Sequence, residues 1–145
     1  MTFTVRRAAE PKKGEPRVPM SKFGKDHWST FGYIECRIVD HGGIPDRNHM
    51  RCDPERHPGL AGSRANYSGE RKKYPTRLAG DNEFLPDHDD WDCAYDLEAV
   101  GLLEDLGTGV NPVFQLTELG HTVAAALRKH KAEGKMFATF KYPPA

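Results

Sequence analysis

Five cysteine and histidine side chains lie close together in the first half of the sequence and could bind a metal ion. Thiolate and imidazole groups are the usual ligands of tetrahedral zinc, and any four of the five could complete such a site. A loop-rich segment with little apolar material would be stabilised by the metal. The simpler interpretation is a core cysteine with histidines at the surface or in hydrogen-bonded loops. The five residues, spaced C-x4-H, H-x2-C and C-x4-H, are Cys36, His41, His49, Cys52 and His57.

Two further patterns could involve a metal. His88 and Cys93 form another candidate pair of ligands. The segment from residue 40 to residue 57 resembles the His–Asn–His family of metal-dependent nucleases. That resemblance implies a histidine base and a metal-bound scissile phosphate. A metal-dependent nuclease is therefore one alternative function of the protein. The matching letters are Asp40, His41, Asn48 and His57.

Cationic and aromatic residues are interleaved between residues 63 and 77. Cations that contact phosphates and rings that stack on bases together suit single-stranded nucleic acid. The same residues would equally suit a solvated loop, or an intramolecular partner for the acidic half of the chain. The residues concerned are Arg64, Tyr67, Arg71, Lys72, Lys73, Tyr74 and Arg77.

Charge is segregated along a chain whose formal net charge is zero. The sequence has 21 basic and 21 acidic residues, yet residues 78–127 contain eleven acids and no lysine or arginine. Such a block creates a local field that steers a partner of opposite charge. We therefore expect an acidic surface that occupies a basic site on a protein or nucleoprotein complex, although a solvated acidic face is the simpler alternative. The expected members of this surface are Asp87, Asp89, Asp90, Asp92, Asp96 and Glu98.

The apolar pattern indicates an α+β fold with an irregular, loop-rich first half. Residues 26–41 fit both an amphipathic helix and a half-buried strand, and their length and the stop at Gly42–Gly43 favour the helix. Residues 42–80 are rich in glycine, proline, asparagine and arginine, and we expect them to be irregular.

The second half shows clearer elements. We expect a helix over 87–103 with acids in its first turn, which complement the helix dipole, and glycines at 107 and 109 that end it. A strand over 113–116 should follow, and then a helix from Thr117, its cap, to near Gly134. The side chains expected to point inward are Trp91, Leu97, Leu102, Leu103, Phe114, Leu116, Leu119, Val123 and Leu127.

Residues 96–127 resemble the second half of a winged helix-turn-helix domain. In that family a helix ends in GLL, a glycine-rich wing follows, a strand ends in LT, and ELG opens the next helix. The resemblance implies a winged-helix-like portion at about residues 86–134, whose helix before the wing would enter the major groove of DNA. A DNA-binding transcriptional regulator is therefore an alternative function. The matching parts are Gly101–Leu103, Gly107–Pro112, Val113–Thr117 and Glu118–Gly120.

The predicted helix over 87–103 differs from that family in its charge. It carries acids and no lysine or arginine. At roughly 4 Å in water each carboxylate–phosphate contact costs on the order of 1 kcal/mol, so the helix should repel DNA. We therefore expect this surface to bind protein instead.

The stretches DHWSTFGYIE and LPDHDDWDC resemble those of small phage and prophage proteins. Together with the acidic block, this resemblance favours a non-enzymatic inhibitor or adaptor of a nucleic-acid-handling complex, as anti-CRISPR proteins are. No glycine-rich phosphate loop or nucleophile–base motif points to an enzyme. With 145 residues, we expect a flexible basic tail over 1–20 and a single domain over 21–145. We expect a cytoplasmic protein without a membrane span or a secretory signal.

Overall fold

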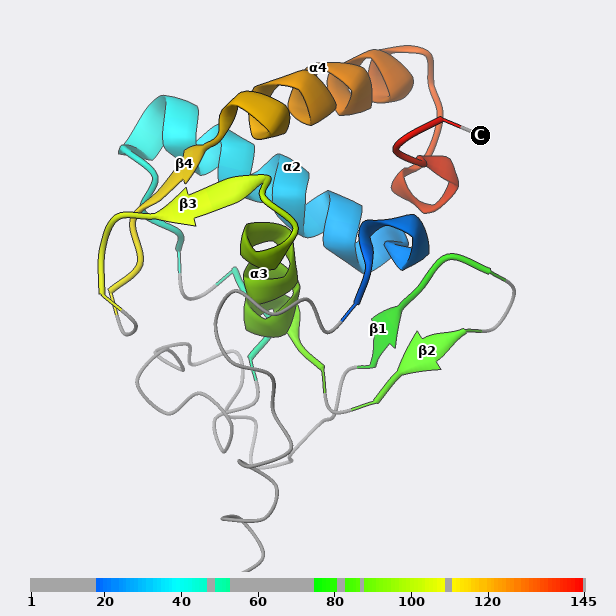
Figure 1. The fold of residues 1–145 in the computed structure, drawn as a ribbon, viewed down its shortest axis with the longest axis horizontal. Coiled ribbons are helices and arrows are strands. Elements are labelled where there is room, and N and C mark those ends of the chain that lie inside the picture. Colours follow the sequence, from blue (N-terminus) through cyan, green and yellow to red (C-terminus); the bar gives the residue numbers. More distant parts are fainter. Residues whose placement is uncertain are drawn as a thin grey trace, which may run out of the picture.

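A computed structural model describes residues 18–46, 49–52, 75–80, 83–86, 88–108 and 111–144. Helices and short antiparallel strands are both present in these residues, so the expected α+β class is confirmed (Figure 1). No helix in the described ranges is both long and apolar enough to cross a membrane. In chain order the elements are η1 Met20–Lys22, α2 Lys25–His41, β1 Thr76–Arg77, β2 Phe84–Leu85, α3 Asp90–Ala99, β3 Leu103–Asp105, β4 Phe114–Leu116, α4 Glu118–Ala132 and η3 Phe137–Thr139.

Helix α2 lies at the centre of the fold. Its Trp28, Phe31 and Ile34 recur at helical spacing and are completely buried. The helix contacts α3, α4, β4, β1 and η3, and Figure 1 shows α4 on one side of it and α3 on the other. It ends at Gly42, whose φ of 64° is the left-handed conformation that glycine adopts without strain. The preference for a helix over a strand in residues 26–41 is confirmed.

Helix α3 is shorter than predicted. It runs from Asp90 to Ala99 rather than over 87–103. Gly101 follows with a φ of 88°, which takes the backbone out of the helical conformation. Leu103 then begins β3. The prediction that the glycines at 107 and 109 end this helix is therefore wrong, because a nearer glycine ends it.

The strand and helix predicted after residue 112 are confirmed in position. Strand β4 pairs antiparallel with β3, with Leu103 opposite Leu116. The side-chain oxygen of Thr117 accepts a hydrogen bond from the N–H of Gly120 at 2.9 Å, so Thr117 caps α4 as predicted. A Cβ atom on Gly43 would lie 2.0 Å from the carbonyl oxygen of Phe114. Glycine at 43 therefore lets the end of α2 approach β4.

Strand β1 of the β1–β2 hairpin lies in the segment predicted to be irregular. Thr76 pairs with Leu85 and Arg77 with Phe84, and a bridge from Phe23 to Leu78 ties the hairpin to the start of α2. The described residues 75–80 therefore correct part of the prediction for 42–80, because pairing with a second strand orders them. Residues 53–74 lie outside the described residues.

The core contains most of the side chains expected to point inward. Seven of these nine are buried, and Leu116 is half-buried. Leu119 is 38% exposed, so its prediction is wrong. It lies beside, not on, the buried face of α4, which is formed by positions 120, 123, 124 and 127. The predicted end of the tail at residue 20 is also too late, because Val18 is only 3% exposed and belongs to the core.

Leu127→Ala should lower the free energy of unfolding by about 2–5 kcal/mol, because it removes a buried side chain and leaves a cavity. Leu119→Ala on the same helix is the matched control and should change it by about 0.5 kcal/mol or less. Urea unfolding followed by far-UV circular dichroism measures both. Equal losses of stability in the two variants would contradict this packing of α4.

Candidate functional site

Three aspartates expected in an acidic surface are buried. Asp89, Asp92 and Asp96 are 4%, 5% and 3% exposed. Oδ1 of Asp89 accepts a hydrogen bond from the N–H of Asp92 at 3.0 Å, and Oδ2 of Asp92 accepts one from the N–H of Asp89 at 3.0 Å. This capping box pairs N–H groups that the start of α3 would otherwise leave unsatisfied. The predicted acidic surface is therefore wrong for these three residues, and Asp87 lies outside the described residues.

The two remaining acids of that prediction are partly covered. Asp90 accepts hydrogen bonds from Arg51, from its Nε at 2.9 Å and from its backbone N–H at 2.8 Å. Burial raises the pKa of Asp90, and the neighbouring Arg51 opposes that effect. Glu98 is half-buried. No residue of α3 is exposed, so this helix offers neither an acidic patch nor a free face.

Asp96 lies between two buried histidines. His27 of α2 and His88, which precedes α3, each place Nε2 2.8 Å from the same oxygen, Oδ2 of Asp96. Burial alone would raise the pKa of Asp96, but the hydrogen bonds from the two histidines outweigh it and hold the pKa below its ordinary value. Burial lowers the pKa of His27, and its hydrogen bond to Asp96 opposes that effect. The cluster therefore favours an ionised carboxylate in the protein interior.

Thr76 and Cys93 complete this cluster, which we call the histidine–aspartate cluster. The hydroxyl oxygen of Thr76 lies 2.7 Å from Nδ1 of His88. Sγ of Cys93 lies 3.8 Å from the same nitrogen. Burial raises the pKa of the Cys93 thiol well above its ordinary value. The thiol is therefore inert as a nucleophile unless a cation approaches it.

The four described residues among the zinc ligands predicted in the first half do not form a metal-binding group. Cys36, His41 and His49 are exposed, whereas Cys52 is buried. Within the part of the chain that the structure describes, the donor atoms of a different set of three side chains converge. These side chains are His27, His88 and Cys93. The further pair His88 and Cys93 therefore does converge, joined by a histidine that the sequence did not single out. His57 lies outside the described residues.

The letters shared with the His–Asn–His nucleases are only partly described. Asp40 and His41 are exposed at the C-terminal end of α2. Asn48 and His57 lie outside the described residues, so the nuclease remains a prediction.

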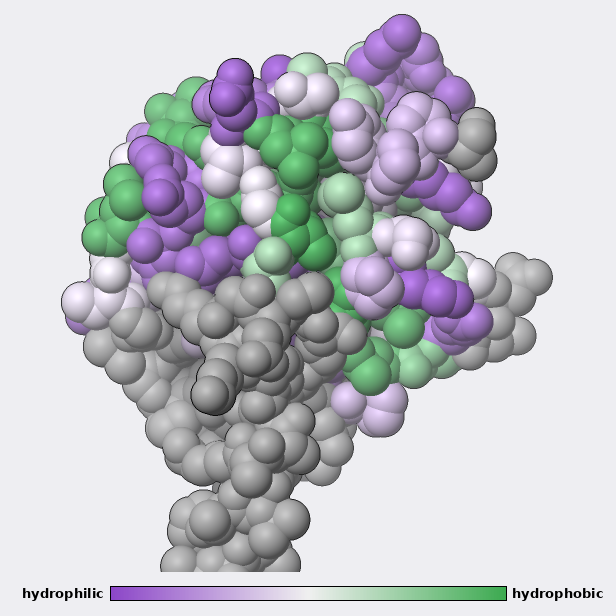
Figure 2. All heavy atoms as spheres, viewed as in Figure 1, coloured by the Kyte–Doolittle hydropathy of each residue, from purple (hydrophilic) through white to green (hydrophobic). Residues whose placement is uncertain are grey.

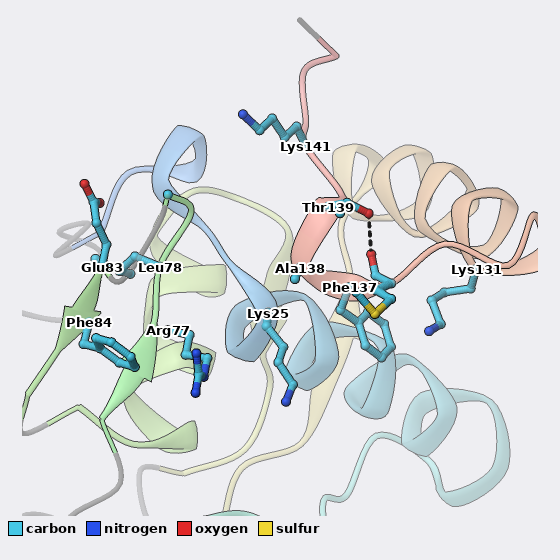
Figure 3. A pocket seen from close by; sticks show the side chains of 12 residues that line it. Lys25, Arg77, Leu78, Glu83, Phe84, Lys131, Phe137, Ala138, Thr139 and Lys141 are labelled. Carbon is cyan, nitrogen blue, oxygen red and sulfur yellow. Dashed lines mark hydrogen bonds between the residues drawn. The ribbon is translucent and has the colours of Figure 1, made fainter.

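A basic groove separates the β1–β2 hairpin from η3 and the end of α4. Its volume is about 790 Å³, and four cations and one carboxylate line it. Figure 3 shows Arg77 and Phe84 on one wall, Phe137 and Lys131 on the other, and Lys25 of α2 between them. Figure 2 shows hydrophilic side chains gathered over the end of α4. The charged lining residues are Lys25, Arg77, Glu83, Lys131 and Lys141.

Each wall of the basic groove pairs a cation with a ring. The Arg77 guanidinium lies 4.9 Å from the centroid of the Phe84 ring. Nζ of Lys131 lies 4.3 Å from the centroid of the Phe137 ring. These cation–π contacts hold the two charges over the walls while leaving both cations exposed. The backbone N–H of Arg77 donates to Asp26 of α2 at 2.6 Å, which fixes the hairpin wall.

The basic groove contains one residue of the nucleic-acid prediction, Arg77. The other six, between Arg64 and Tyr74, lie outside the described residues. Sequence reasoning missed Lys25, Phe84 and Lys131. The signal that could have found Lys131 was the excess of basic residues after position 127, where residues 128–145 carry five basic and one acidic side chain. No family model, curated protein or solved structure matches the chain.

Asp89→Ala should lower the free energy of unfolding by about 0.5–2 kcal/mol, since the change removes the cap of α3. Asp40→Ala is the control, because Asp40 is an exposed acid in the last turn of α2. It should have no destabilising effect, since an acid is unfavourable at that end of a helix. Chemical denaturation measures both variants. A stability loss in Asp40→Ala as large as that in Asp89→Ala would argue against the capping box.

Proposed function

We propose that the protein is a non-enzymatic binding protein that takes single-stranded nucleic acid into the basic groove. The observation that carries the proposal is the pairing of cations and phenyl rings on both walls, Arg77 with Phe84 and Lys131 with Phe137. Exposed cations contact phosphates, and rings offer stacking surfaces to bases. Four cations against one carboxylate give the groove the charge that a polyanion requires.

The accessibility of α3 and of the groove's rings favours single-stranded nucleic acid over duplex DNA. A winged-helix-like arrangement would read duplex DNA with the helix before the wing. Here that helix is α3, whose residues are all buried or half-buried. The Phe84 ring, which is 43% exposed, in contrast suits a base that is not stacked in a duplex. The winged-helix assignment therefore remains part of the proposal for the fold and carries no DNA-reading role.

The inhibitor or adaptor function predicted from the sequence is compatible with this proposal if the inhibitor binds nucleic acid. An anti-CRISPR-like protein of a phage would act here by competing for the nucleic acid of the target complex, not by presenting an acidic surface to it. The burial of Asp89, Asp92 and Asp96 supports this form. The single-stranded nucleic acid itself, and not a basic protein, is then the primary partner.

Reversing one charge on each wall should weaken binding. Arg77→Glu and Lys131→Glu should each raise the Kd for a labelled mixed-sequence oligonucleotide by about tenfold, because each removes one charge-assisted hydrogen bond to a phosphate. The slope of log K against log salt concentration should become shallower by about 0.7 for each phosphate that the variant no longer neutralises. Fluorescence anisotropy at several salt concentrations measures both quantities.

Lys129→Glu is the matched control for Lys131→Glu. Lys129 is exposed in the same last turn of α4 but does not line the groove. It should raise the Kd less than Lys131→Glu does, because Lys129 does not line the groove and the effect of a charge weakens with distance and with salt. Tight binding to duplex and not to single strands, or no binding to either, would refute the proposal. The latter result would point to an acidic protein as the partner of the groove.

A further inference from the structure

The two rings of the basic groove are not equivalent. Phe84 belongs to the hairpin and is exposed, whereas Phe137 belongs to η3 and is half-buried. The Phe137 ring packs on α2, where a Cβ atom on Gly32 would lie 3.6 Å from it. Nζ of Lys131 also lies over this ring, 4.3 Å from its centroid. Phe137 therefore holds η3 against the fold, and Phe84 is the ring that a base can reach.

The cation over Phe84 extends the stacking surface of that ring. The Arg77 guanidinium lies 4.9 Å from the ring centroid, and Phe84 is still 43% exposed with this contact in place. A guanidinium is planar and stacks on flat groups, whereas the ammonium of Lys131 is a compact, strongly hydrated charge. Unpaired bases stack on aromatic rings and on guanidinium planes alike. The hairpin wall therefore offers a stacking surface that the opposite wall lacks.

Charge divides the groove in the same way. On the hairpin, Arg77 and Glu83 carry one charge of each sign, so the charges of this wall sum to zero. The other three charged residues described along the groove are lysines, from α2, α4 and the segment after η3 (Figure 3). An ammonium group is a point charge with three donors, which binds a phosphate without a fixed orientation. The three exposed lysines are Lys25, Lys131 and Lys141.

We propose that the basic groove has two subsites of different chemistry. Phe84, with Arg77 over it, stacks a single unpaired base, and the three lysines bind neighbouring phosphates of the same strand. The inference rests on the proposed binding of single-stranded nucleic acid. It adds that the groove contacts one base, while the rest of the strand is bound through its backbone. Binding tolerates any sequence, because every base has a face that can stack.

Three oligonucleotides of one length test this division with the wild-type protein. The first carries every base, the second carries a single base in an otherwise abasic strand, and the third is fully abasic. The first two should bind nearly equally, and the third should bind about tenfold more weakly, because it lacks one stacking contact. The slope of log K against log salt concentration should be the same for all three, since they carry the same phosphates. Fluorescence anisotropy measures both quantities.

Two variants at position 84 test the stacking subsite. Phe84→Leu should raise the Kd for the strand with every base about tenfold and leave the Kd for the abasic strand unchanged. Phe84→Trp keeps a flat ring and should bind like the wild type. Its added emission should be quenched by the strand with every base and not by the abasic strand. Trp28 and Trp91 are both buried, so wild-type protein supplies their constant background.

Lys131→Gln tests the phosphate subsite on the opposite wall. It removes a charge and leaves the stacking surface of Phe84 in place, so it should weaken binding of the abasic strand and of the strand with every base by the same factor. The salt dependence of both should become shallower, because one phosphate is no longer neutralised. Phe84→Leu, in contrast, should leave the salt dependence unchanged.

Two results would overturn the two subsites and leave the proposed function in place. One is a wild-type protein that binds the strand with every base much more tightly than the strand with a single base. The other is a folded Phe84→Leu variant that binds the strand with every base as tightly as the wild type, or that weakens binding of this strand and of the abasic strand equally. Wild-type protein that binds no oligonucleotide would refute the proposed function together with this inference. Because the three strands are compared on wild-type protein, a variant that fails to fold does not prevent the test.

Discussion

The carboxylate of Asp96, buried between two imidazoles, is the constraint on which the rest of the fold depends. An unpaired charge in a protein interior costs several kcal/mol, so Asp96 can be buried only where both hydrogen bonds form. His27 must therefore face α3, and His88 must be held at the start of that helix. This requirement fixes how α2 and α3 lie against each other. The apolar residues of α2, among them Trp28 and Phe31, then pack into the hydrophobic core.

Burial in the tertiary structure also decides which charges reach the surface. Residues 78–127 are acidic in sequence, but in α3 Asp92 belongs to the capping box, Asp96 to the buried cluster, and Asp90 pairs with Arg51. The cations that remain exposed come from separate parts of the chain. Lys25, Arg77 and Lys131 are 50 or more residues apart and meet at one groove. A chain of zero net charge thereby presents a basic groove.

Strand β1 connects the buried cluster to the groove. Successive side chains of a strand point to opposite faces. Thr76 is completely buried and touches His88, while its neighbour Arg77 is exposed over Phe84. The two-residue strand thus holds the inner cluster with one side chain and forms a groove wall with the next.

The sequence by itself determined the local elements. Periodicity predicted α2, the strand at 113–116 and α4, and Thr117 and the glycines at 42 and 134 marked their ends, because caps and periodic burial depend on neighbours in sequence. Tertiary structure alone decided the placement of the charged residues and of the candidate metal ligands. Asp96 looks like a surface acid until His27, 69 residues away, is placed beside it. Burial and pairing of a side chain depend on contacts between distant segments, and residue type and spacing do not encode those contacts locally.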